Sequence, residues 1–149
     1  MARLPTILLV EDNPRDAELT MLALERSRIE SDVVLARDGA EALAILFPDQ
    51  SAKGADLAPL PQLVLLDLKL PKIDGVEVLE QIRGNQRTAL LPVVILTSSD
   101  EERDIRACYE RCANSYIRKS VDFTAFNEAV QQIGRYWLTL NISPVSAAG

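Results

Sequence analysis

Residues 63–67 of the chain read Leu-Val-Leu-Leu-Asp, so that a carboxylate follows directly on four consecutive apolar residues. A continuous apolar run of this length is typical of a strand that is buried on both faces of a parallel sheet. Runs of the same kind occupy residues 7–10, 33–36 and 93–96, and a shorter one occupies residues 116–117. We therefore expect five strands.

Segments with helical spacing of their apolar residues separate these runs. We expect helices over residues 15–28, 39–46, 76–83, 100–111 and 123–138, with Asp100 as the N-cap of the fourth. Residues 47–61, rich in Pro, Gly and polar residues, are expected to form a long loop. Strand and helix then alternate five times, which predicts an α/β fold: a single domain with a doubly wound, five-stranded parallel sheet. We expect this domain to span residues 5–138, followed by a C-terminal tail at 139–149.

The composition excludes several classes of function. The 149 residues include no histidine, which rules out Ser-His-Asp and Cys-His catalysis, histidine-containing metal sites and a phosphohistidine donor. The net charge of −6 argues against binding to a nucleic-acid backbone or an anionic membrane surface. Two cysteines, Cys108 and Cys112, are too few for a disulfide framework. We expect reduced thiols, with a redox pair as the alternative.

The apolar runs are also too short for targeting or membrane insertion. The run at 7–10 is followed at once by acidic residues, unlike a signal peptide. No stretch approaches the roughly 18–20 apolar residues that a transmembrane helix needs. The sequence predicts a soluble, cytoplasmic protein.

Polar side chains follow four of the expected strands. Glu11 and Asp12 follow the first strand, Asp67 the third, Thr97 ends the fourth, and Lys119 follows the fifth. In a parallel sheet these strand ends meet at one edge, where such sheets bind ligands. Clustered carboxylates repel one another unless a cation joins them, and oxygen-only ligands suit Mg²⁺. A carboxylate there could attack a phosphoryl group, with lysine and threonine stabilising the phosphoryl oxygens.

These residues resemble a known family. The pattern is similar to the receiver domain of two-component response regulators, whose fold is the CheY-like, flavodoxin-like sheet, and the resemblance covers residues 5 to about 138. The motifs that carry it are Glu11-Asp12, Asp67-Leu68-Lys69-Leu70-Pro71, Asp74-Gly75, Thr97-Ser98 and Lys119.

The resemblance implies a role for each residue of the expected magnesium site. Asp67 would be the phospho-acceptor. Asp12 would bind Mg²⁺ directly and Glu11 through water, and the backbone carbonyl of Lys69 would supply a third protein ligand.

The resemblance also implies a switch. Thr97 would be the hydroxyl that turns toward the phosphoryl group, and Lys119 would be the ion-pair partner of that group. Tyr116, three residues before the lysine, matches the aromatic switch position, and an ordinary core or surface tyrosine is the alternative.

The sequence departs from the family after the lysine. Most receivers have a proline there, usually after a cis peptide bond, and this chain has Ser120. A cis bond before a residue other than proline costs about 2.5–4 kcal/mol. The Lys119–Ser120 bond is therefore expected either to be trans, with altered loop geometry, or to be strained. The Lys-Ser pair, the long loop before Asp67 and the final Tyr-Trp-Leu at 136–138 resemble the small receivers that pair with phytochrome histidine kinases.

Two partners follow from these features. Because the chain has no histidine, the resemblance implies that a sensor histidine kinase, of the phytochrome type, holds the phosphohistidine donor. The last helix would be about 24 Å long, against about 17 Å for a five-residue strand, so its end should overhang the sheet. Its apolar overhang predicts a homodimer, with Tyr136, Trp137 and Leu138 as interface candidates.

Several alternatives stay open at this point. A receiver could dock without switching, drain a kinase as a phosphate sink, or pass the phosphoryl group along a relay. Two rival functions on a similar sheet are disfavoured by the residues at the site. A Mg²⁺-dependent phosphohydrolase would commonly have a second acid at the position of Lys69, and the acids at residues 11–12 would repel the phosphate of a flavin carrier's ligand. We expect no enzyme beyond catalysis of the chain's own phosphorylation and dephosphorylation.

Overall fold

The computed structural model describes residues 4–48 and 59–145 and confirms the alternation of strands and helices. Of the loop expected at 47–61, residues 49–58 lie outside this description. The elements are β1 (Thr6–Val10), α1 (Pro14–Arg26), β2 (Asp32–Ala36), α2 (Gly39–Leu46), β3 (Leu63–Leu66), α3 (Gly75–Gly84), β4 (Val93–Thr97), α4 (Glu102–Glu110), β5 (Ser115–Arg118), α5 (Phe123–Arg135) and a π-helical turn, η2 (Tyr136–Leu140).

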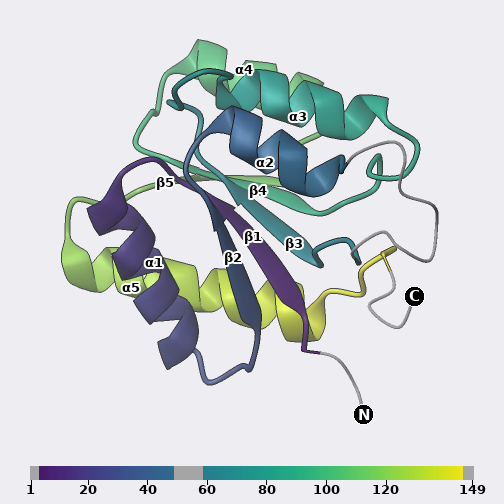
Figure 1. Ribbon diagram of the computed structural model, residues 1–149. Helices are drawn as coiled ribbons and strands as arrows, with labels where there is room; N and C mark the ends of the chain where they lie inside the picture. The colour runs from purple at the N-terminus through teal and green to yellow at the C-terminus, as the bar shows by residue number, and fades with distance from the viewer. Residues whose placement is uncertain (1–3, 49–58, 146–149) are drawn as a thin grey trace.

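The five strands form one parallel sheet in the order β2-β1-β3-β4-β5. Helices α2, α3 and α4 cover one face, and α1 and α5 cover the other (Figure 1). The direction of winding reverses between β1 and β3, so the carboxyl ends of these two strands lie at the switch point, where sheets of this type bind ligands. The expected doubly wound architecture is thus confirmed.

The burial of the strands explains the apolar runs. Every residue of β3 and β4 is buried, since both faces of these strands are covered by helices. Edge strand β2 alternates between exposed and more buried residues, as expected for a strand with fewer neighbours. One core cluster lies under α2 and α3, and the other lies under α1 and α5.

Helix α4 begins later than expected, and Asp100 is not its cap. Glu101 occupies the N-cap position and makes no side-chain cap hydrogen bond. The Asp100 carboxylate instead pairs with the Arg118 guanidinium at 3.2 Å. Aspartate is a favoured N-cap residue, but the ion pair with Arg118 at the end of β5 decides where the Asp100 side chain lies.

The end of the last helix also differs from the expectation. Helix α5 ends at Arg135 and continues as η2, and the chain then turns back so that Val145 packs against the α2–α3 core (Figure 1). Trp137 and Leu138 are partly buried against the α1–α5 core, so the expected overhang of these two residues is wrong. The side chains that remain exposed here are Tyr136, Leu140 and Ile142.

The two cysteines occupy different environments. Cys108 lies on the buried face of α4, and burial raises the pKa of its thiol to about 11. Cys112 is exposed on the turn after α4, and both thiols are free. Within residues 4–48 and 59–145, no helix is both long and apolar enough to cross a bilayer.

Gly75 lets the start of α3 approach the end of β3. A Cβ at this position would lie 2.3 Å from the carbonyl oxygen of Asp67 and 2.6 Å from the Cα of Leu68. Both neighbours are backbone atoms, so a larger residue must displace the strand end. We expect Gly75→Ala to lower the free energy of unfolding by about 3 kcal/mol in urea titrations.

Gly84, at the other end of the same helix, provides the matched control for this substitution. A Cβ there would meet nothing within 4 Å, so Gly84→Ala should leave stability unchanged or raise it by about 0.5 kcal/mol. Equal effects of the two variants would contradict the close-approach explanation.

Candidate functional site

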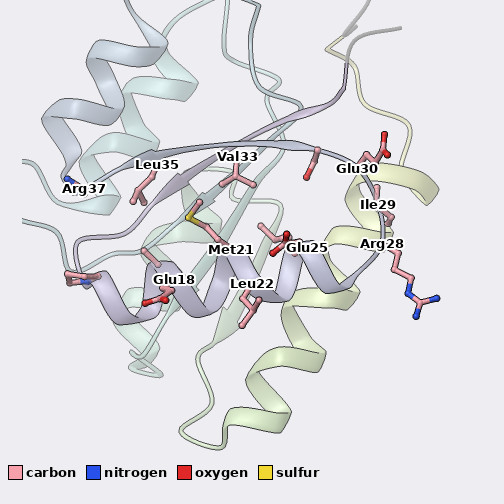
Figure 2. Close-up of a pocket in the computed structure, with 14 residues that line it drawn as sticks. Glu18, Met21, Leu22, Glu25, Arg28, Ile29, Glu30, Val33, Leu35 and Arg37 are labelled. Atoms are coloured by element: carbon pink, nitrogen blue, oxygen red, sulfur yellow. The ribbon is translucent and has the colours of Figure 1, made fainter.

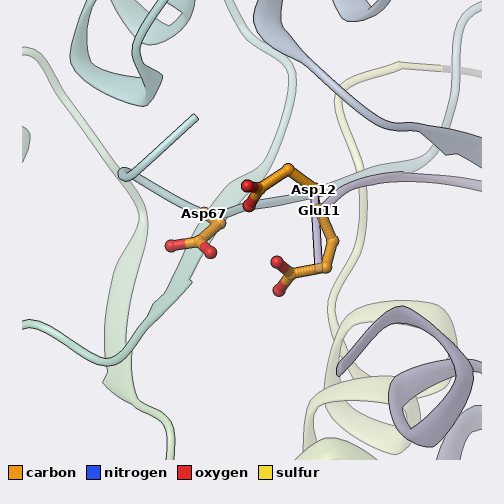
Figure 3. A group of neighbouring side chains, drawn as sticks. All are labelled: Glu11, Asp12 and Asp67. Atoms are coloured by element: carbon orange, nitrogen blue, oxygen red, sulfur yellow. The ribbon is translucent and has the colours of Figure 1, made fainter. Parts of the chain in front are cut away.

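Two adjacent strands bring the predicted acids together. Val10 of β1 lies beside Leu66 of β3 in the parallel register, so the residues that follow both strands meet at the sheet edge. Side-chain oxygens of Glu11, Asp12 and Asp67 all lie within 4.8 Å of one another. Figure 3 shows these three carboxylates gathered at the strand ends. Glu11 and Asp67 are buried, whereas Asp12 is exposed, so the cluster is open to solvent on one side.

Lys119 lies against the same cluster. Its ammonium contacts the carboxylates of Glu11 at 2.5 Å, Asp67 at 3.0 Å and Asp16 at 3.0 Å, and its side chain is only 9% exposed. The backbone N–H of Lys119 donates to the Thr97 carbonyl at 2.7 Å. No peptide bond in residues 4–48 and 59–145 is cis, so the chain reaches this position with a trans bond before Ser120.

The site is electrostatically costly without a further cation. Burial raises the pKa of Glu11 to about 7, opposed by the hydrogen bond from Lys119 and reinforced by the charge of Asp67. Burial alone would lower the pKa of Lys119, but the hydrogen bond to Glu11 and the charge of Asp67 outweigh it and raise that pKa. The single positive charge of Lys119 is therefore shared by the carboxylates of Glu11, Asp16 and Asp67.

This arrangement predicts that a neutral residue at position 11 stabilises the fold. The folded-state pKa of Glu11 lies above its ordinary value of 4.5, so folding takes up a proton between the two values. The stability of the wild type therefore falls as pH rises through this window. We expect Glu11→Gln to raise the free energy of unfolding by about 2 kcal/mol at pH 8 and by much less at pH 5.

Urea titrations in metal-free buffer would measure this effect. The exposed Glu18 on α1 supplies the control, because Glu18→Gln should show no such dependence on pH. A destabilised Glu11→Gln variant at pH 8 would mean that the bond to Lys119 outweighs the cost of burying the charge.

Thr97 brings a hydroxyl to the same edge of the sheet. It ends β4 and is fully buried, and among the described residues its hydroxyl has no hydrogen-bond partner. An unsatisfied buried polar group costs about 1–3 kcal/mol. A hydroxyl left in this state beside a carboxylate cluster fits a site that receives oxygen atoms from a ligand.

Tyr116 is tied to the loop that follows Thr97. Its hydroxyl donates to the Ser99 carbonyl at 2.9 Å, and burial raises its pKa. The Ser99 hydroxyl in turn donates to Asp104 of α4 at 2.6 Å. The tyrosine is thus neither a free surface residue nor a purely apolar core residue, because it connects β5 to the β4–α4 loop.

The Lys69 side chain pairs with an acid outside the cluster of Glu11, Asp12 and Asp67. Its ammonium lies 3.8 Å from Asp104 and is largely exposed. The ligand role expected for its backbone carbonyl stays a prediction. Tyr136, Trp137 and Leu138 lie on η2, and their role as a dimer interface likewise stays a prediction.

Asp16 is the site residue that the sequence pattern did not reveal. It lies in the first turn of α1, two residues after Pro14, and its backbone N–H donates to the side chain of the N-cap Asn13. An acid in the first turn of a helix is common, because its negative charge interacts favourably with the positive end of the helix dipole. Only the closeness of α1 to the β5–α5 loop turns this carboxylate toward Lys119.

A large groove lies away from the acids. It has a volume of about 1060 Å³ and runs between α1 and β2, where Met21 faces Val33 and Leu35 (Figure 2). None of the three clustered acids lines it. A smaller cavity of about 380 Å³ opens beside the site and is lined by Asp16, Lys119 and the start of α5.

The donor set fits a hard divalent cation. Three carboxylates with one exposed member offer oxygen ligands and leave room for water or phosphate oxygens, which is how Mg²⁺ is usually held. Such a cation would also favour the charged form of Glu11, whose pKa is raised by burial first and by the charge of Asp67 second.

The chain is similar to curated single-domain regulators over most of its length. It is 43% identical over 138 residues to the probable methanogenesis regulatory protein FilR2 of Methanothrix harundinacea, covering 93% of this chain and 86% of that protein. It is 42% identical over 132 residues to response regulator Rcp1 of Synechocystis sp., covering 89% and 88%.

Solved structures show the same likeness. The Mn²⁺-bound form of Rcp1 superposes with a TM-score of 0.83 at 40% identity, covering 94% of this chain and 99% of that one. The phosphorylated cyanobacterial phytochrome response regulator RcpA gives a TM-score of 0.86 at 39% identity, covering 95% and 99%. In sequence, the family model of the response regulator receiver domain matches residues 7–131 of the chain. The chain that gathers its acids at the ends of β1 and β3 thus belongs to the response regulator receiver family.

Proposed function

We propose that this response regulator accepts a phosphoryl group on Asp67 from the phosphohistidine of a sensor histidine kinase, in a Mg²⁺-dependent reaction. One observation carries the proposal: the buried Asp67 carboxylate lies 3.0 Å from the Lys119 ammonium within a cluster of acids suited to a divalent cation. The absence of histidine from the chain is consistent with a donor on another protein.

Asp12, Asp67 and the backbone carbonyl of Lys69 would hold Mg²⁺ directly, with Glu11 acting through water. Bound there, the cation would offset the negative charge of the incoming phosphoryl oxygens. A carboxylate oxygen of Asp67 attacks phosphorus in line with the histidine nitrogen. The new O–P bond forms as the P–N bond breaks, and the electron pair of that bond returns to the histidine of the kinase.

Two further side chains would orient the transferred group. The Lys119 ammonium shifts a hydrogen bond from Asp67 to a phosphoryl oxygen. The Thr97 hydroxyl, unpartnered among the described residues, donates to another oxygen. Since the phosphoryl group adds nearly two negative charges, it favours this inward arrangement over the original one.

Tyr116 would transmit the change to the surface. Movement of Thr97 displaces the β4–α4 loop, which Tyr116 holds through the Ser99 carbonyl. The surface of α4, β5 and α5 would then differ between the two states, and a partner that prefers one state would read it.

The test is phosphorylation by a small donor. Incubation with acetyl phosphate and Mg²⁺ should add the mass of one phosphate to the intact chain, and chelation of the metal should prevent it. An unchanged mass in the presence of metal would contradict the proposal. We propose no other catalysis than this phosphorylation and its reversal.

A phytochrome-type kinase is the donor that we propose. The support is the likeness to RcpA, a phytochrome response regulator, together with the Ser120 that follows Lys119. Phosphoryl transfer from a purified, phosphorylated phytochrome kinase should be much faster than transfer from an unrelated histidine kinase. Equal rates from both kinases would contradict this pairing.

We also propose a homodimer, built on η2. Tyr136 is 49% exposed, and Leu140 and Ile142 extend the apolar surface beside it. Light scattering at micromolar concentration should give twice the chain mass, and a monomer in both phosphorylation states would contradict the proposal.

We place the domain at residues 5–138 and the tail at 139–149, of which 146–149 lie outside the described structure. We also propose a cytoplasmic location without nucleic-acid or membrane partners.

A further inference from the structure

Asp16 is bound to the site lysine without belonging to the cluster of acids suited to a cation. Its carboxylate lies 3.0 Å from the Lys119 ammonium. Within the part of the chain that the structure describes, the group of side chains that could share a metal ion consists of Glu11, Asp12 and Asp67. Asp16 therefore contacts the lysine from the side of α1 and not from the strand ends.

The three acids on Lys119 use all of its donors. An ammonium has three N–H groups, and Glu11, Asp16 and Asp67 each accept one. Asp67 would hold a divalent cation directly and Glu11 through water, so both acids would direct charge to the cation as well as to the lysine. The cation would also repel the ammonium, and the contacts of Lys119 with Glu11 and Asp67 would weaken together. Asp16 is the partner that would stay with the lysine alone.

The loop that carries Lys119 is anchored at the lysine and exposed beyond it. The backbone N–H of Lys119 donates to the Thr97 carbonyl at 2.7 Å, whereas Val121 is fully exposed. On the opposite side, Asp16 is held firmly by α1, because Asn13 accepts hydrogen bonds from the backbone N–H groups of Arg15 and Asp16. A carboxylate fixed on α1 thus faces the Lys119 ammonium, and the loop becomes exposed directly after the lysine, at Ser120 and Val121.

We infer that Asp16 is a positioning residue for Lys119. It would keep the ammonium in the site while a bound cation weakens the contacts of Lys119 with Glu11 and Asp67, so that the ammonium is in place when the phosphoryl group arrives. The inference rests on the proposed function, since it assigns a part in that transfer to a residue outside the metal site.

Charge and not size should matter at this position. At saturating Mg²⁺ we expect Asp16→Asn to lower the rate of phosphorylation by acetyl phosphate about tenfold. Asp16→Glu keeps the charge, and the partial exposure of the site leaves room for the longer side chain, so this variant should stay within about threefold of wild type. Glu18→Gln, on the same helix, removes an acid that does not contact the lysine and should match the wild type.

A second measurement is independent of phosphoryl transfer. In ¹H–¹⁵N spectra with Mg²⁺, the wild type should show a slowly exchanging Lys119 ammonium signal, which Asp16→Asn should lose and Asp16→Glu should keep. Circular dichroism would show that each variant is folded, and Asp16→Ser would replace Asp16→Asn if that variant unfolds.

The outcomes separate the two proposals. Should the wild type gain no phosphate, the proposed function fails, and the ammonium signal still tests the contact with Asp16. Should the wild type react and Asp16→Asn react equally fast, or should Asp16→Asn and Asp16→Glu be equally slow, the positioning role is overturned and the proposed function stands.

Discussion

Asp67→Asn is expected to abolish phosphoryl acceptance. The amide lacks the anionic oxygen that attacks phosphorus, and it removes one of three acids from a cluster whose oxygens lie within 4.8 Å of one another. Intact mass after incubation with acetyl phosphate and Mg²⁺ measures the effect directly. Wild type should gain one phosphate and the variant none, which corresponds to a loss of more than about a hundredfold in rate.

A neighbouring acid outside the site gives the control. Asp100 is exposed and paired with Arg118, so Asp100→Asn should be phosphorylated like the wild type. A phosphate gained by Asp67→Asn at the wild-type rate would move the acceptor to another acid, with the exposed Asp12 as the next choice.

Lys119→Met is expected to cause the largest loss of stability. The substitution removes the cation shared by Glu11, Asp16 and Asp67 and leaves two buried carboxylates unpaired. Removing one partner of a buried ion pair costs about 3–5 kcal/mol. We expect a loss of that size at pH 7.5 in urea titrations without divalent metal.

The loss should depend on pH and on metal in a defined direction. The pKa of Glu11, about 7 in the wild type, rises further without the ammonium, so at pH 5 this acid is protonated and the deficit shrinks. Because the folded-state pKa of Lys119 is raised, its stabilising contribution is present below its ordinary pKa of 10.5 and is lost only above it. Millimolar Mg²⁺ should also reduce the deficit, since it replaces the lost cation.

Lys72 serves as the matched control. Its ammonium is largely exposed and pairs with Asp38 at 3.4 Å, and exposed pairs contribute about 0–1 kcal/mol. Lys72→Met should therefore change stability little at either pH. A Lys119→Met variant as stable at pH 7.5 as the control would contradict the view that one ammonium offsets three acids.

The sequence was informative where local chemistry and burial agree. A run such as residues 63–66 has one stable environment, between two layers of helices, so the strand and the carboxylate after it could be predicted together. The meeting of Glu11 with Asp67 follows from the parallel pairing of β1 with β3.

Elsewhere, residue type was a poor guide. Asp100 has the chemistry of a helix cap, but a guanidinium on the next strand end competes for it. Trp137 lies in the part of the last helix that the helix length predicted to extend beyond the sheet, but it is partly buried against the α1–α5 core. In both cases a contact between distant segments outweighs a local preference.

The amino-acid order by itself therefore determined the alternating elements, the parallel sheet and the acids that its carboxyl edge must gather, because burial and strand pairing act on short, continuous runs. Only the tertiary structure decided that Asp16 shares the lysine, that the lysine reaches the site through a trans bond, and that the hydroxyl of Thr97 is left without a partner in the described chain. The contact between Asp16 and Lys119 depends on the distance between a helix and a loop more than 100 residues apart, and no local pattern encodes that distance.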